Sequence, residues 1–128
     1  MPSTKNILLV DDNSLNRRLV IAILTGLPFT IIERDNGKDA LDYLLANAND
    51  IDLVLLDIGM PGMSGVDICK IIRSSADSSL CDKPVIAYTA HAMRQEQEMY
   101  LRIGFNDVLI KPMTKHDLLN TVDKYLPL

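Results

Sequence analysis

Short apolar runs alternate with longer amphipathic segments along the whole chain. The runs cover residues 6–10, 29–33, 52–56, 84–88 and 107–110. Each run has the length of a strand, and several are apolar on both faces, which is typical of a parallel sheet covered by helices on either side. The pattern therefore predicts five strands, most of them buried.

The segments between the runs carry a helical period. Apolar residues stand at positions 20, 23, 24 and 27, with Asn13 as a candidate N-cap and Gly26 near the expected end of that helix. Apolar positions 118, 122, 125 and 126 repeat the pattern, and Thr114 followed by Asp117 fits a variant of the capping box. We expect five helices in all, one after each strand.

Five strands alternating with five helices predict a doubly wound α/β fold, because parallel strands need crossover connections and those connections are right-handed. The 128 residues are used up by these units, so we expect a single domain over residues 1–128 and no output domain. The stretch 74–83, rich in Ser and Asp, is expected to be an ordinary solvated loop before the fourth strand.

Charge and composition exclude several classes of partner. Thirteen Lys and Arg against seventeen Asp and Glu give a net charge of −4, the wrong sign for binding nucleic acid through counterion release. No apolar run approaches the roughly 18 residues of a membrane span, and the start lacks a signal peptide's apolar stretch. Cys69 and Cys81 have no Cys-x-x-Cys spacing, which favours reduced thiols. We expect a cytoplasmic protein that binds neither nucleic acid nor membrane.

Polar side chains follow four of the five apolar runs. Asp11 and Asp12 come after the first run, Asp57 after the third, Thr89 at the end of the fourth and Lys111 after the fifth. In open α/β sheets, ligands bind beyond the carboxyl ends of the strands. If the first and third strands are neighbours, about 4.8 Å apart, three carboxylates must share a small volume.

Such a cluster needs a cation, because two like charges about 4 Å apart repel by roughly 4 kcal/mol at an effective dielectric of 20. Mg²⁺ fits best, since it binds carboxylates, keeps several waters and contacts phosphate oxygens. This chemistry points to phosphoryl transfer, with Lys111 and Thr89 facing the transferred group and one carboxylate as nucleophile. A single strand-end Asp is more often a cap or turn residue, so the prediction depends on the joint occurrence.

Four motifs resemble the receiver domains of two-component response regulators, over essentially the whole chain. They are LLVDDN at 8–13, LLDIGMPGMSG at 55–65, AYTA at 87–90 and IKP at 110–112. The resemblance implies a flavodoxin-like, CheY-like sheet of order 2-1-3-4-5. It further implies a protein whose only catalysis is its own phosphorylation and dephosphorylation, and which signals to a downstream protein target.

The same resemblance implies residue roles. Asp57 would be the phosphoacceptor, taking a phosphoryl group from the phosphohistidine of a histidine kinase or histidine phosphotransfer protein. Thr89 and Lys111 would contact the phosphoryl group, and the Lys111–Pro112 bond is typically cis in this family. The implied Mg²⁺ ligands are Asp11, Asp12, Asp57 and the backbone carbonyl of Gly59.

Some positions depart from the family pattern or extend it. Receivers often carry Tyr or Phe three residues before the lysine, and here that position is Val108. Tyr88 precedes Thr89 but is expected to point elsewhere. His91, two residues after Thr89, is either a residue that tunes hydrolysis of the aspartyl phosphate or an exposed His at a helix start. The polar segment 94–98 is either a solvated helix face or a partner surface.

Other function classes remain open. A pseudo-receiver would keep the fold as a scaffold that works without phosphorylation. A hydrolase of the haloacid dehalogenase type needs a second acid two residues after the nucleophile, where this chain has Gly59. A flavin or nucleotide binder needs glycines and backbone amides where this chain has Asp11 and Asp12. The motifs fit both a free-standing receiver and the receiver of a hybrid kinase.

Overall fold

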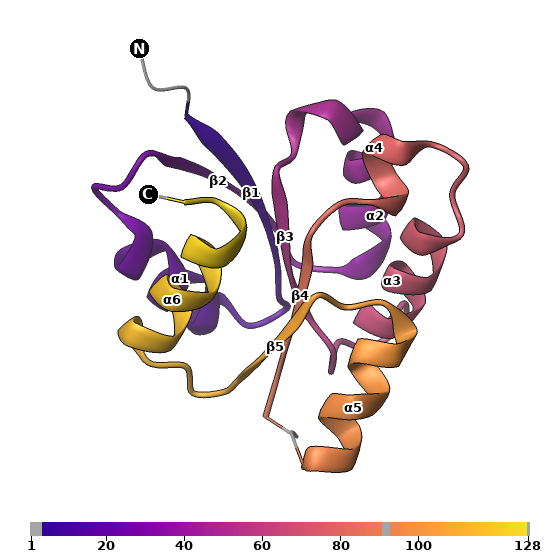
Figure 1. Cartoon of the computed structure of the whole chain (residues 1–128). Coiled ribbons are helices and arrows are strands. Elements are labelled where there is room, and N and C mark those ends of the chain that lie inside the picture. The colour runs from indigo at the N-terminus through magenta and orange to yellow at the C-terminus, as the bar shows by residue number, and fades with distance from the viewer. Residues whose placement is uncertain (1–3, 91–92, 128) are drawn as a thin grey trace.

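The computed structural model describes residues 4–90 and 93–127. Five parallel strands form one sheet in the order β2-β1-β3-β4-β5 (Figure 1). The strands are β1 (Lys5–Val10), β2 (Phe29–Arg34), β3 (Leu53–Asp57), β4 (Val85–Thr89) and β5 (Asp107–Ile110). The predicted strands and their order are confirmed, and each bound lies within one residue of the prediction.

The helices alternate with the strands as expected. They are α1 (Ser14–Leu24), α2 (Gly37–Ala46), α3 (Gly65–Arg73), α4 (Ser78–Cys81), α5 (Arg94–Ile103) and α6 (Lys115–Tyr125), with a 3-10 turn at Ala48–Asp50. The Asn13 side chain accepts a hydrogen bond from the Asn16 amide at 3.0 Å, and Thr114 accepts one from the Asp117 amide at 3.0 Å. Both predicted N-caps are therefore confirmed. Within the described residues, no helix has the length and apolar content to cross a membrane.

Helix α4 corrects one expectation, because the stretch 74–83 is not an irregular loop throughout. Asp77 caps this one-turn helix by accepting a hydrogen bond from the Ser79 amide at 3.0 Å. Leu80 then enters the core with 5% of its surface exposed. The described residues thus contain one short helix beyond the five predicted. A Ser- and Asp-rich stretch indicates polarity, but one cap and one buried leucine are enough to order it.

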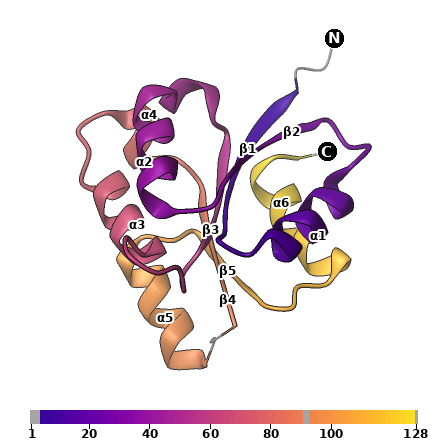
Figure 2. The same ribbon diagram turned by 180° about the vertical axis from the view of Figure 1, so that it is seen from behind.

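The sheet separates two hydrophobic clusters, and successive residues of β1 point to opposite sides. Leu8 and Val10 pack under α2, α3, α4 and α5, whereas Ile7 and Leu9 pack under α1 and α6 (Figures 1 and 2). All residues of β3 and β4 are buried, as expected for central strands covered on both faces. The two layers hold the carboxyl ends of the strands at one common edge.

Arg73, the last residue of α3, joins segments from four parts of the chain. Its guanidinium donates to the carbonyl oxygens of Gly104 at 2.8 Å, Cys81 at 2.9 Å and Lys83 at 2.7 Å, and to the Asn106 side chain at 2.7 Å. Gly104 lies at φ +129°, and a Cβ there would come within 2.8 Å of Arg73 Cγ. One half-buried cation therefore ties α3 to α4, to the start of β4 and to the turn before β5.

Candidate functional site

Three carboxylates converge at the carboxyl edge of the sheet. Strands β1 and β3 are neighbours, with Val10 opposite Leu56, so Asp11 and Asp57 emerge side by side. One oxygen from each of Asp11, Asp12 and Asp57 lies within 4.8 Å of the others. Asp11 and Asp57 are buried, whereas Asp12 is exposed and leaves the cluster open to solvent. The structure thus brings together the three acids that the sequence places at separate strand ends.

Lys111 supplies the positive charge of the cluster from the end of β5. Its Nζ lies 3.1 Å from Asp57 Oδ2 and 3.6 Å from Asp11 Oδ2. Its backbone amide donates to the Thr89 carbonyl at 2.8 Å, which fixes where the side chain starts. The Lys111–Pro112 peptide bond is cis, as expected. Among the residues that the structure describes, a single ammonium group therefore pairs with both buried carboxylates.

The two buried acids respond in opposite ways to this arrangement. Burial raises the pKa of Asp57, and the neighbouring Asp11 adds to the effect, although the Gly59 amide and Lys111 act against it. Burial also favours the neutral form of Asp11, but hydrogen bonds from Tyr88 and the Asn13 amide, with the charge of Lys111, hold the pKa of Asp11 below its usual value. Asp11 is thus the acid that favours the ionised form. Asp57 is the acid whose ionised form an added cation would stabilise most.

Tyr88 is the site residue that sequence reasoning missed. Its hydroxyl donates to Asp11 Oδ2, and Lys111 Nζ lies 4.5 Å from the centre of its ring. Register places Tyr88 opposite Asp57, so a phenol pointing to the α1 and α6 side can reach past β3 to the end of β1. Burial and the two acids raise the pKa of Tyr88, which keeps the hydroxyl a donor.

Thr89 closes β4 at the same edge and is buried. It points to the opposite side of the strand from Tyr88, where a side-chain hydrogen bond joins it to Tyr100 of α5. The Asp57 carboxylate is held next to this strand end, with its Oδ1 accepting from the Gly59 amide at 2.9 Å. All four strand-end groups predicted from the sequence therefore lie at one edge.

A family described as "Response regulator receiver domain" matches residues 7–123, which is most of the chain. The chain belongs to this family.

Related receivers occur both alone and inside large kinases. The polar-differentiation response regulator DivK of Brucella ovis is 33% identical, with 96% of this chain and 97% of that protein covered. The histidine-protein kinase BarA of Escherichia coli K12 is 36% identical over 94% of this chain, and the hybrid kinase I of Dictyostelium discoideum is 33% identical over 95%. This receiver spans only 13% of BarA and 7% of the hybrid kinase.

Solved receivers share the fold closely. The chemotaxis regulator CheY4 of Vibrio cholerae superimposes with a TM-score of 0.86 over 97% of this chain and 100% of that one, at 23% identity, which shows the fold alone. CheY of Borrelia burgdorferi, in a complex described as CheX-CheY-BeF3-Mg²⁺, gives a TM-score of 0.85 at 27% identity, covering 94% and 87% of the two chains.

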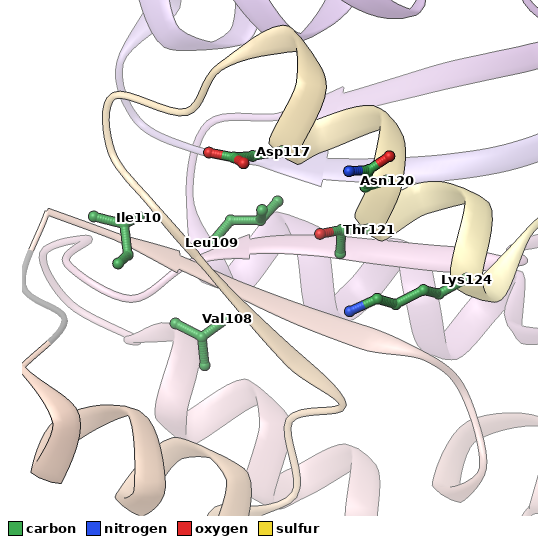
Figure 3. A pocket seen from close by; sticks show the side chains of 7 residues that line it. All are labelled: Val108, Leu109, Ile110, Asp117, Asn120, Thr121 and Lys124. Atoms are coloured by element: carbon green, nitrogen blue, oxygen red, sulfur yellow. The ribbon is translucent and has the colours of Figure 1, made fainter.

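Val108, the position that departs from the family pattern, lies in β5, and the polar segment 94–98 forms the first half of α5. Val108 is half-buried and lines a pocket of about 370 Å³ between β5 and α6, together with Ile110 and residues of α6 (Figure 3). Segment 94–98 begins with a strongly exposed Arg94, which pairs with Glu98 at 3.5 Å, as on a solvated helix face. His91 lies outside the described residues.

Gly65 sets how closely α3 approaches the buried acid Asp57, and its replacement tests that contact. A Cβ at this position would lie 2.5 Å from the Asp57 carbonyl oxygen, a backbone atom. We expect Gly65→Ala to lower the free energy of unfolding by roughly 1–3 kcal/mol and to displace Asp57. Urea unfolding measures the first effect, and the chemical shifts of the Asp57 and Gly59 amides measure the second.

Gly26→Ala is the matched control for this prediction. Gly26 has φ +87° with open space around it, so the substitution adds backbone strain without crowding the site. We expect a loss of stability of about 1 kcal/mol and unchanged shifts around Asp57. Unchanged Asp57 shifts in Gly65→Ala as well would contradict the role assigned to Gly65.

Proposed function

We propose that this receiver accepts a phosphoryl group on Asp57 from the phosphohistidine of a histidine kinase or histidine phosphotransfer protein, in a Mg²⁺-dependent reaction. The observation that carries the proposal is the convergence of Asp11, Asp12, Asp57 and Lys111 at one edge of the sheet. Phosphoryl transfer to a carboxylate needs a nucleophile, neutralising charge and an open approach, and this edge offers all three.

The reaction is a displacement at phosphorus. A carboxylate oxygen of Asp57 attacks, the new P–O bond forms, and the P–N bond of the phosphohistidine breaks with its electron pair returning to the imidazole nitrogen. Lys111, 3.1 Å from Asp57 Oδ2, is placed to pair with an oxygen of the arriving group. Thr89 exchanges its contact with Tyr100 for a contact with another phosphoryl oxygen. The receiver acts on no other substrate.

The donor set fits Mg²⁺, since each group is a hard oxygen and Asp12 is open to solvent. Asp12, Asp57 and the backbone carbonyl of Gly59 would hold the ion directly, and Asp11 would hold it through water. When bound, Mg²⁺ supplies positive charge for the phosphoryl oxygens and for the acid cluster.

Exposed apolar side chains suggest where partner proteins touch this receiver. Leu15 and Leu19 stand one turn apart on α1, directly after the acidic loop, with 71% and 43% of their surfaces exposed. We assign the phosphodonor to this face. The downstream protein target would contact Met99 and Ile110, which are exposed beside Tyr100 and Lys111. The free thiols Cys69 and Cys81 fit a cytoplasmic setting.

Intact-mass measurement after incubation with acetyl phosphate and Mg²⁺ tests the proposal. We expect the protein to gain the mass of one phosphoryl group with Mg²⁺ and none when EDTA removes the metal. A protein that folds and binds Mg²⁺ but gains no mass is a phosphorylation-independent scaffold. Multiple turnover on a phosphate monoester would instead support the hydrolase class.

A further inference from the structure

Asp11 is contacted by four separate groups through three hydrogen bonds and one ion pair. Its Oδ1 accepts from the Asn13 amide at 2.9 Å, and its Oδ2 accepts from the Tyr88 hydroxyl and faces Lys111 Nζ at 3.6 Å. Its backbone carbonyl accepts from Arg17 at 2.6 Å. A carboxylate has about four lone-pair positions. Hydrogen bonds from Asn13 and Tyr88 occupy one on each oxygen, and the ammonium group of Lys111 faces Oδ2 as well, so these three groups decide which way the carboxylate points.

Tyr88 is the most deeply buried of the residues that contribute these contacts. It has 1% of its surface exposed, its backbone lies in the fully buried strand β4, and its ring packs in the cluster beneath α1 and α6. The same ring lies 4.5 Å from Lys111 Nζ, within range of a cation–π contact. The Tyr88 side chain therefore contacts both the Asp11 carboxylate and the Lys111 ammonium group from the α1 and α6 side of the sheet.

We propose that Tyr88 is a positioning residue of the Mg²⁺ site, whose hydroxyl orients the Asp11 carboxylate toward the metal's water shell. This inference rests on the proposed function, because it assumes that the acid cluster binds Mg²⁺. A hydrogen-bond donor behind a metal-binding carboxylate fixes its orientation, and removal of such a partner weakens metal affinity by about 10- to 100-fold. With Asp11 reaching the ion through water, the effect falls at the lower end of that range.

Tyr88→Phe tests the hydroxyl alone, since it keeps the buried ring and its contact with Lys111. We expect the dissociation constant for Mg²⁺, measured calorimetrically without any phosphodonor, to rise about tenfold. Tyr125→Phe is the matched control. The Tyr125 hydroxyl also donates, at 2.9 Å to the Asn106 carbonyl and at 3.4 Å to Asp107 Oδ2, but it lies at the amino end of β5, at the opposite edge of the sheet from Asp11, Asp12 and Asp57. We expect this control to bind Mg²⁺ like the wild type.

A double-mutant cycle separates action through Asp11 from a general loosening of the fold. In an Asp11→Ala background, Tyr88→Phe should cause no further loss of Mg²⁺ affinity, because its acceptor is gone. An equal loss in both backgrounds, or wild-type affinity in Tyr88→Phe, would overturn the inference and leave the proposed function standing. A wild-type protein that binds no Mg²⁺ would overturn both.

The wild-type protein offers a second readout that needs no variant. In Mg²⁺ titrations followed by NMR, the Tyr88 ring signals should shift with the same midpoint as the Asn13 amide, which shares Asp11 as its acceptor. The Tyr125 ring signals should stay constant over the same range. The inference would be overturned if the Tyr88 ring signals did not shift with added Mg²⁺ while the Asn13 amide signal did.

Discussion

The Asp57→Asn variant is expected to take up no phosphoryl group from acetyl phosphate and yet to be more stable than the wild type in metal-free buffer at pH 7. The first result follows because an amide cannot act as the nucleophile that the proposed reaction needs. The second follows because Asp57 is buried, shares one lysine with Asp11 and has a raised pKa. Relief of this repulsion, less the lost pair with Lys111, should stabilise the fold by about 1–2 kcal/mol.

The stability difference between Asp57→Asn and the wild type should depend on pH, and the raised pKa of Asp57 fixes the sign of that dependence. A carboxyl group whose pKa is raised on folding stabilises the fold fully below its unfolded pKa of about 3.9. It loses that contribution as the pH rises through the folded value. The stability difference between Asp57→Asn and the wild type should therefore be near zero at pH 4 and should grow toward pH 7. Urea unfolding with EDTA at a series of pH values measures it.

Added Mg²⁺ should reverse the order of stability, because it binds the folded wild type more tightly than the variant. The combined result is informative, since a stable variant that takes up no phosphoryl group cannot have lost activity through unfolding. An Asp57→Asn protein that is less stable than the wild type at pH 7 without metal would contradict the electrostatic account. Phosphoryl uptake by the variant would contradict the assignment of the acceptor.

Replacing Arg73 by Met should cause the largest loss of stability, about 3 kcal/mol in the free energy of unfolding. Methionine keeps much of the apolar stem, but four hydrogen bonds disappear and the carbonyl oxygens of Gly104, Cys81 and Lys83 lose a charged donor. Arg73→Lys should recover only part of the loss, because an ammonium group cannot reproduce the planar fork. Urea unfolding at pH 7 measures both.

Arg102→Met is the matched control for this prediction. Arg102 lies on α5 and is exposed, so its replacement should change stability by no more than about 0.5 kcal/mol. An Arg73→Met variant no less stable than this control would show that the guanidinium bonds do not hold α3, α4 and the turn before β5 together.

The sequence predicted the strands well because burial on both faces leaves a strong signal. Residues 7–10 and 53–56 are continuous apolar runs, and the structure buries every one of them. The acid cluster was predictable for a related reason, since strand ends in a parallel sheet share an edge whatever the loops do. The convergence of Asp11, Asp12 and Asp57 thus followed from the order of strands.

The features that the sequence did not reveal are mostly contacts between groups that lie far apart in the chain. No sequence motif singles out Arg73, because three of its acceptors are backbone carbonyl groups that have no sequence signature. Tyr88 was expected to point elsewhere, because nothing in the sequence indicates that its hydroxyl reaches past β3 to Asp11. Helix α4 needed only one cap and one buried leucine, too little for a periodic pattern.

Two neighbouring residues of strand β4 make hydrogen bonds on opposite sides of the sheet. Tyr88 is bonded to Asp11 on the side of α1 and α6, and Thr89 is bonded to Tyr100 on the side of α5. A rotation of the Thr89 side chain alone breaks only the bond to α5, whereas a shift of the whole strand end strains both. The contact between β4 and α5 can therefore change without a change in the contact between β4 and Asp11, although the two residues that make these contacts are neighbours in the chain.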